Sequence, residues 1–128
     1  MAGKLVHFEI PAKDTSRATE FYKELFDWKI ETFQGPTEYH MIEGDPGGGI
    51  YTAIDDDDAP RIYFDTDDID ATIARVRKLG GQAEEKAPVP NMGWYAQCKD
   101  TEGNQISLWQ ADESAPMPAG VGSETGTA

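Results

Sequence analysis

Residues 5–26, LVHFEIPAKDTSRATEFYKELF, decide the fold class of this chain. They begin with apolar and polar side chains that alternate from Leu5 to Ile10, which is the period of a half-buried strand. After Pro11, either Asp14 or Thr15 is placed to cap a helix. The apolar residues of that helix recur at helical spacing: Ala18, Phe21, Tyr22, Leu25 and Phe26. The stretch therefore predicts a strand followed directly by an amphipathic helix.

Three more strands complete a first module, residues 1–54. Turns rich in glycine and proline, at residues 34–36 and 45–48, separate these strands from one another. The strand-like stretches are residues 28–33, 39–43 and 49–54. The order of elements is then strand, helix, strand, strand, strand.

The pattern starts again after an acidic connector, residues 55–60, in which four consecutive aspartates and a proline cannot continue a strand. Residues 61–81, RIYFDTDDIDATIARVRKLGG, repeat the strand and the helix, with Asp67 or Asp68 as the cap. Further strand-like stretches follow at 82–86, 94–99 and 105–110. The halves coincide at an offset of 54 residues, at which Asp14 falls on Asp68.

These observations predict an α+β fold of two tandem βαβββ modules, residues 1–54 and 61–111. The sheets are expected to be mostly antiparallel, with one helix outside each module. Residues 112–128 lack apolar bulk, so we expect a disordered tail there.

The composition excludes several classes of partner and indicates a compartment. With 24 acidic against 11 basic residues, the net charge of −13 repels nucleic acid and anionic membranes. The acidity is typical of a soluble surface, or of a field that attracts cationic ligands. The single cysteine, Cys98, can form no intramolecular disulfide, and no apolar stretch resembles a leader or a membrane span. We expect a cytoplasmic protein.

Three motifs in this order resemble the vicinal oxygen chelate superfamily, which includes glyoxalases, bleomycin-resistance proteins and extradiol dioxygenases. They are VHFEIPAKDTSRATEFYKELFDWKIE at residues 6–31, the second-module start at residues 61–81, and DTEGNQISLWQ at residues 100–110. The likeness is strongest to short bacterial glyoxalase-like proteins of undetermined chemistry. The resemblance implies curled sheets that form a cup, and a homodimer.

Metal enzymes of this superfamily place ligands on the first and last strands of both modules. Carried onto this chain, the first-strand position is His7 and the fifth-strand position is Arg61. The fourth-strand position is Tyr51 or Gly49, and the eighth-strand position is Ser107. Because only His7 is an ordinary ligand, the resemblance implies no standard metal triad and no cofactor, although a divalent metal held by His7, Glu9 and unorthodox partners stays an alternative.

Each candidate residue also has a structural interpretation. His7 is either a hydrogen-bonded strand residue or a proton-transferring base, and Glu9 is its neighbour on the same face. Arg61 either pairs with Glu9 or anchors an anionic ligand. The aromatic residues Tyr51, Tyr63 and Trp109 either fill strands or stack on a flat ligand. Cys98 is interpreted as a buried strand residue.

Three functions are consistent with these residues. The first is a metal-independent cup that binds a small organic ligand through Glu9, Tyr51, Arg61, Tyr63, Ser107 and Trp109, with His7 as a catalytic base if turnover occurs. The second is a metal-dependent glyoxalase-like lyase or dioxygenase. The third is a drug-sequestering resistance protein whose acidic surface concentrates cationic molecules.

Overall fold

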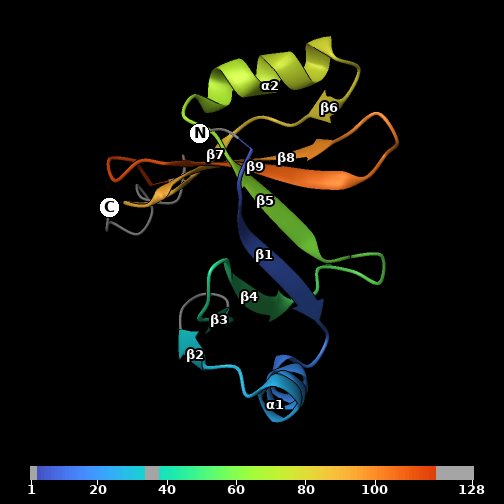
Figure 1. The fold of residues 1–128 in the computed structure, drawn as a ribbon, viewed down its shortest axis with the longest axis vertical. Coiled ribbons are helices and arrows are strands. Elements are labelled where there is room, and N and C mark those ends of the chain that lie inside the picture. Colours follow the sequence, from blue (N-terminus) through green and yellow to red (C-terminus); the bar gives the residue numbers. More distant parts are fainter. Residues whose placement is uncertain (1–2, 34–37, 118–128) are drawn as a thin grey trace. The chain divides into compact units, whose positions relative to one another are not determined.

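The computed structural model describes residues 3–33 and 38–117 of the 128-residue chain (Figure 1). Over these residues the element order is strand, helix and three strands, followed by a second strand, helix and further strands. The elements are β1 (Leu5–Ala12), α1 (Thr15–Phe26), β2 (Ile30–Phe33), β3 (Tyr39–Ile42), β4 (Gly47–Thr52), β5 (Arg61–Asp65), α2 (Ile69–Lys78), β6 (Gln82–Ala83), β7 (Ala87–Val89), β8 (Gly93–Lys99) and β9 (Gln105–Ala111).

The chain divides into two compact units within β5. The first comprises residues 5–62, of which 5–33 and 38–62 are described, and we call it the N-terminal unit. The second comprises the described residues 3–4 and 63–117, and we call it the C-terminal unit.

In the N-terminal unit the strand order is β2-β3-β4-β1. The β1–β4 pair is parallel, whereas β2–β3 and β3–β4 are antiparallel. Helix α1 packs against β4 and β1. Ile50 of β4 is fully buried and Ile42 of β3 nearly so, which places the apolar centre of this unit between α1 and these strands.

The C-terminal unit repeats this order as β5-β9-β8-β6, with β7 also paired to β8. Its β5–β9 pair is parallel and its other strand pairs are antiparallel. Helix α2 packs against β6, β8 and β9. The buried core consists of Ile69, Ile73, Ala96, Cys98 and Leu108. The α+β fold of tandem βαβββ modules is thus confirmed, and Cys98 lies in the core as a buried strand residue.

Both helices begin at the aspartates that the sequence offered as caps. The Asp14 carboxylate accepts a hydrogen bond of 3.0 Å from the amide of Arg17, and Asp68 accepts one of 3.1 Å from Ala71. Asp68 rather than Asp67, and Asp14 rather than Thr15, is therefore the cap. The two caps are 54 residues apart, as the repeat predicts.

Several element bounds differ from the sequence prediction. Strand β1 continues through Pro11 to Ala12, because proline tolerates extended backbone and Pro11 pairs with Tyr51 in the parallel ladder. Strand β4 begins at Gly47 rather than at residue 49, and the short strand β7 was not anticipated.

The apolar face predicted for α1 does not pack on the sheet. Phe21, Leu25 and Phe26 are 57%, 54% and 53% exposed. The buried residues of α1 are Thr15 and Thr19. Helical periodicity located the apolar stripe correctly, but tertiary packing turned most of that stripe outward, because the sheet under α1 accommodates the smaller threonine side.

The predicted tail, residues 112–128, is described only up to residue 117. Within it, Ala115 is 4% exposed and its carbonyl accepts a hydrogen bond from the amide of Asn91. Residues 118–128 lie outside the described part of the chain. Over the described residues, no helix is long and apolar enough to cross a membrane.

Replacing Ile50 by alanine should test where the core of the N-terminal unit lies. Ile50 is 0% exposed, so Ile50→Ala is expected to lower the free energy of unfolding by about 2–5 kcal/mol. Ile54→Ala is the matched control, because Ile54 is 73% exposed and its loss should cost less than about 0.5 kcal/mol. Urea unfolding followed by circular dichroism measures both; equal effects would contradict this assignment of the core.

Candidate functional site

The N-terminal unit places four of the predicted positions on one face of its sheet. Glu9 lies opposite Gly49 in the β1–β4 ladder, and Pro11 lies opposite Tyr51. Because strand side chains alternate between faces, His7, Glu9 and Tyr51 point to the side opposite Phe8, whose ring lies 6.1 Å from that of Trp28 beside α1. This side, opposite α1, is called the open face below.

A third side chain, Tyr39 of β3, connects His7 and Glu9. The Tyr39 hydroxyl donates to Glu9 Oε2 at 2.9 Å and lies 2.9 Å from His7 Nε2. The direct distance from His7 Nε2 to Glu9 Oε2 is 3.9 Å, too long for a hydrogen bond. The hydroxyl is therefore the bridge between the imidazole and the carboxylate.

This bridge fixes the tautomer of a neutral His7. A tyrosine hydroxyl has one hydrogen, and the Glu9 carboxylate, which can only accept, takes it. His7 Nε2 must then carry a hydrogen and donate to Tyr39, which leaves the lone pair of the ring on Nδ1. Burial lowers the pKa of His7 below its ordinary value, and the nearby charge of Glu9 only partly opposes this effect. His7 is accordingly a neutral base at pH 7.

Gly49 is what permits Tyr39 to reach this position. A Cβ at residue 49 would overlap the Tyr39 hydroxyl. The neighbouring Gly48 serves the other face, where a Cβ would lie 2.5 Å from the tip of the Phe8 ring. The glycine run of β4 therefore admits one aromatic side chain from each face of the sheet.

The strand registers decide between Gly49 and Tyr51 as the fourth-strand position of the superfamily. Gly49 lies opposite Glu9, and Ser107 lies opposite Tyr63 in the equivalent parallel pair of the C-terminal unit. Glu9 and Tyr63 are 54 residues apart, which is the repeat offset. Gly49 is thus the counterpart of Ser107, and the Tyr39 hydroxyl fills the space into which a side chain at residue 49 would project.

This donor set does not fit a divalent metal of the kind that the superfamily uses. Of the four positions, His7 alone carries an ordinary ligand, while Gly49 has no side chain and Arg61 is a fixed cation. Among residues 3–33 and 38–117, no three His, Cys, Asp or Glu side chains gather closely enough to hold a metal ion. The second histidine, His40, is 4% exposed and contacts Thr32, away from the open face.

Arg61 belongs to a second polar group in the N-terminal unit. Its guanidinium Nη2 lies 3.4 Å from Asp58 Oδ1, and its Cζ lies 5.2 Å from the centre of the Tyr51 ring. The Tyr51 hydroxyl donates to the same Asp58 oxygen at 2.8 Å. The last aspartate of the acidic connector therefore folds back to join Tyr51 and Arg61, a pairing that the sequence did not indicate.

The ionisation states of this group follow from its contacts. Burial would raise the pKa of Asp58, but hydrogen bonds from the Ile54 amide and from Tyr51, with the charge of Arg61, hold it below its ordinary value. Burial and the hydrogen bond to Asp58 raise the pKa of Tyr51. At neutral pH the group consists of a carboxylate, a guanidinium and a protonated phenol, so Asp58 compensates much of the Arg61 charge.

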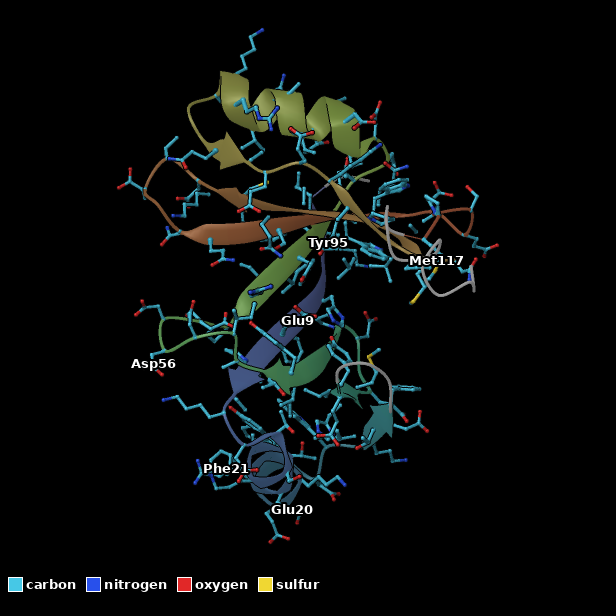
Figure 2. The ribbon with its side chains drawn as sticks, turned by 180° about the vertical axis from the view of Figure 1, so that it is seen from behind. Glu9, Glu20, Phe21, Asp56, Tyr95 and Met117 are labelled. Carbon is cyan, nitrogen blue, oxygen red and sulfur yellow. The ribbon has the colours of Figure 1, made fainter. Side chains whose placement is uncertain are left out.

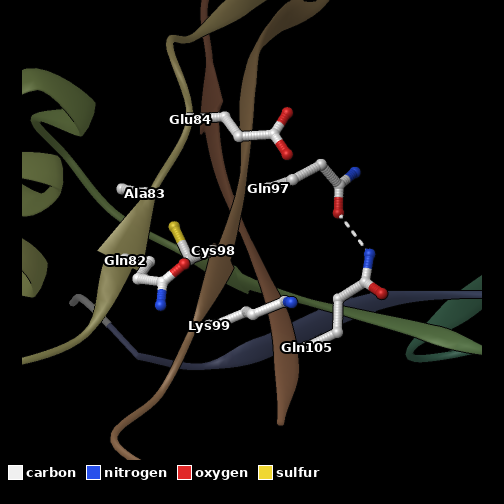
Figure 3. A pocket seen from close by; sticks show the side chains of 7 residues that line it. All are labelled: Gln82, Ala83, Glu84, Gln97, Cys98, Lys99 and Gln105. Carbon is white, nitrogen blue, oxygen red and sulfur yellow. Dashed lines mark hydrogen bonds between the residues drawn. The ribbon is translucent and has the colours of Figure 1, made fainter. Parts of the chain in front are cut away.

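The remaining predicted residues lie in the C-terminal unit. Ser107 is fully buried, and its hydroxyl donates to Gln97 Oε1 at 2.9 Å. Gln105 Nε2 donates to the same oxygen at 3.0 Å (Figure 3). Trp109 lies opposite Tyr95 in the β8–β9 ladder. Beside Gln97 is a polar pocket of about 280 Å³, lined by Gln82, Ala83, Glu84, Gln97, Cys98, Lys99 and Gln105.

Sequence reasoning missed Tyr39 and Asp58. Tyr39 stood in a predicted strand with no partner assigned, although the glycine run 47–49 signals that another chain segment approaches closely there. Asp58 was hidden among four identical charges, so its individual role had no local signal.

Comparison with known proteins agrees with this fold and these positions. The family model described as Glyoxalase/Bleomycin resistance protein/Dioxygenase superfamily matches residues 4–108. A glyoxylase-like domain-containing protein of Didymella fabae is 31% identical over 118 residues, which cover 83% of this chain and 92% of the relative. The chain therefore belongs to the glyoxalase/bleomycin-resistance/dioxygenase superfamily.

Solved structures share the fold at low identity. A hypothetical protein from Bacillus halodurans has a TM-score of 0.70 at 15% identity, covering 90% of this chain and 99% of its own. Streptomyces coelicolor methylmalonyl-CoA epimerase, in complex with 2-nitronate-propionyl-CoA, has a TM-score of 0.68 at 17% identity, covering 91% and 100%. At these identities the likeness establishes the fold alone.

A double-mutant cycle should show that Gly49 and Tyr39 are coupled. Gly49→Ala displaces the Tyr39 hydroxyl and its hydrogen bonds, so we expect it to lower the free energy of unfolding by about 1–3 kcal/mol. In a Tyr39→Ala background the same change should cost less than about 0.5 kcal/mol, because the overlap is gone. Urea unfolding of the four proteins gives the coupling; additive effects would refute it.

The pKa of His7 should respond to Glu9 with a definite sign. It should lie below 6.5 in the native protein, and Glu9→Gln should lower it further, because the charge that opposes the burial effect is removed. The folded-state pKa lies below the unfolded one, so His7 makes the protein less stable as the pH falls through 6.5, and more so in the variant. NMR titration of the imidazole measures this, with the His7 signal identified by its loss in His7→Gln; a rise in Glu9→Gln would contradict it.

Proposed function

We propose that this chain binds a small organic ligand on the open face of the N-terminal unit, through Glu9, Tyr39 and His7, and does so without a divalent metal. The observation that carries this proposal is the Tyr39 hydroxyl over Gly49, which bridges His7 and Glu9 where a metal ligand would otherwise project. The three groups offer a ligand both hydrogen-bond donors and acceptors.

The charges around this site favour an uncharged ligand over an anion. Arg61, the predicted anion anchor, has its charge compensated by Asp58 at 3.4 Å. Glu9, whose side chain is only 17% exposed, adds a carboxylate to the same unit. An anionic ligand would therefore meet a net negative site, whereas a ligand with carbonyl, amide or hydroxyl groups avoids that repulsion.

His7 supplies the means for proton transfer if the ligand is also a substrate. Its lowered pKa keeps the imidazole neutral near pH 7, and its Nε2–H is held by Tyr39, so Nδ1 is the atom that accepts a proton. The solved methylmalonyl-CoA epimerase in complex with methylmalonyl-CoA shows that this fold accommodates an organic substrate. Binding without turnover would instead indicate a sequestering protein.

Matched ligand pairs test the proposal. We expect benzamide and related uncharged amides to shift the amide NMR signals around His7, Glu9 and Tyr39 in the presence of EDTA. The corresponding benzoates should bind about tenfold more weakly, because one like charge at this distance is worth roughly 1–2 kcal/mol. Glu9→Gln should narrow the difference between the pair, and Tyr39→Phe should weaken both members.

Metal dependence has a separate readout. Elemental analysis of protein purified without a tag or chelator should show divalent metal at background, and EDTA should leave ligand binding unchanged. Stoichiometric metal that is lost in His7→Ala would overturn the metal-independent site. Ligand shifts confined to other parts of the chain would overturn its location.

A further inference from the structure

Helix α1 presents a mixed apolar and charged face to solvent. Phe21 and Leu25 are more than half exposed, and Figure 2 shows Glu20 and Phe21 projecting outward from α1. A shallow hollow on this face is lined by Arg17, Glu20, Phe21, Glu24 and Leu25. We call these five residues the α1 outer face.

The helix does not need these apolar side chains to seat on its own sheet. Its buried residues are Thr15 and Thr19, and the Thr15 hydroxyl donates to Glu38 Oε1 at 3.0 Å. The larger apolar residues Phe21 and Leu25 are left on the outside, where exposing them to water costs free energy. An exposed apolar patch with a charged rim is typical of a protein–protein contact.

The charges on the outer face are self-complementary. Arg17 and Glu24 are seven residues apart, so they lie on one line of the helix, two turns or about 10.5 Å from each other. Within the described part of the chain, neither side chain takes part in an ion pair. When two such helices lie antiparallel, Arg17 of each meets Glu24 of the other, and the two Phe21 side chains come together at the centre.

We propose that the α1 outer face binds the same face of a second copy of this chain, forming an antiparallel, two-fold symmetric dimer. The symmetric arrangement uses one patch on both copies and closes on itself. Phe21 and Leu25 supply the apolar centre, and the two Arg17–Glu24 pairs set the direction and register of the helices. This surface lies on α1, away from the open face, so the dimer is independent of the proposed ligand site.

Charge reversal gives a test that only a second copy can satisfy. Arg17→Glu alone places two glutamates against each other at both ends of the helix pair, and Glu24→Arg alone does the same with two arginines. Each variant should therefore dimerise at least about tenfold more weakly than the native chain. An equimolar mixture of the two should recover a mixed dimer, because every contact then joins opposite charges.

The variants are suited to this comparison because neither harms the helix. Glutamate near the start of α1 and arginine near its end both interact favourably with the helix dipole. Phe21→Ser, at an exposed position, should also leave the fold intact while weakening the dimer. Circular dichroism checks the fold of each variant.

Sedimentation velocity over a range of concentrations measures association. A native chain that dimerises, single variants that do not, and a mixture that does would establish the interface. A native chain that stays monomeric at its highest soluble concentration would overturn the proposal. It would equally be overturned by single variants that dimerise like the native chain, or by a mixture that fails to recover the dimer.

Discussion

The close approach of two aromatic side chains to strand β4 is the constraint on which the N-terminal unit depends. Phe8 presses on Gly48 from the α1 side, and the Tyr39 hydroxyl lies over Gly49 on the other. No residue with a Cβ fits either position without displacement, so the register of β1, β3 and β4 is held by sterics as well as by hydrogen bonds. The polar network of the candidate site exists because this register brings Tyr39 between His7 and Glu9.

The acidity of the chain has different consequences at different positions. Most of the 24 acidic residues give the surface its net charge. Asp58 has a separate role, since its carboxylate receives hydrogen bonds from Tyr51 and from the backbone while it faces Arg61. The superfamily position occupied by Arg61 is thereby nearly neutral, and Glu9 determines the sign of the potential at the open face.

Helix α1 separates two tasks that one apolar stripe usually performs. Its threonine side seats the helix on the sheet, whereas Phe21 and Leu25 remain outside. The α2 helix shows the ordinary arrangement, with Ile69 and Ile73 buried in the core of its unit. Two helices with the same place in the repeat thus use their apolar residues differently, which is why α1 rather than α2 is the candidate for self-association.

Local patterns in the sequence determined the fold class and the order of elements. Strand alternation from Leu5, the caps at Asp14 and Asp68 and the offset of 54 residues depend on neighbours within a few positions, so they could be read directly. Only the tertiary structure decided that Gly49 rather than Tyr51 is the fourth-strand position, and that Tyr39 and Asp58 complete the polar groups around His7 and Arg61. These depend on the register between strands some 40 residues apart, and a slip of one residue would turn every side chain of a strand to the opposite face.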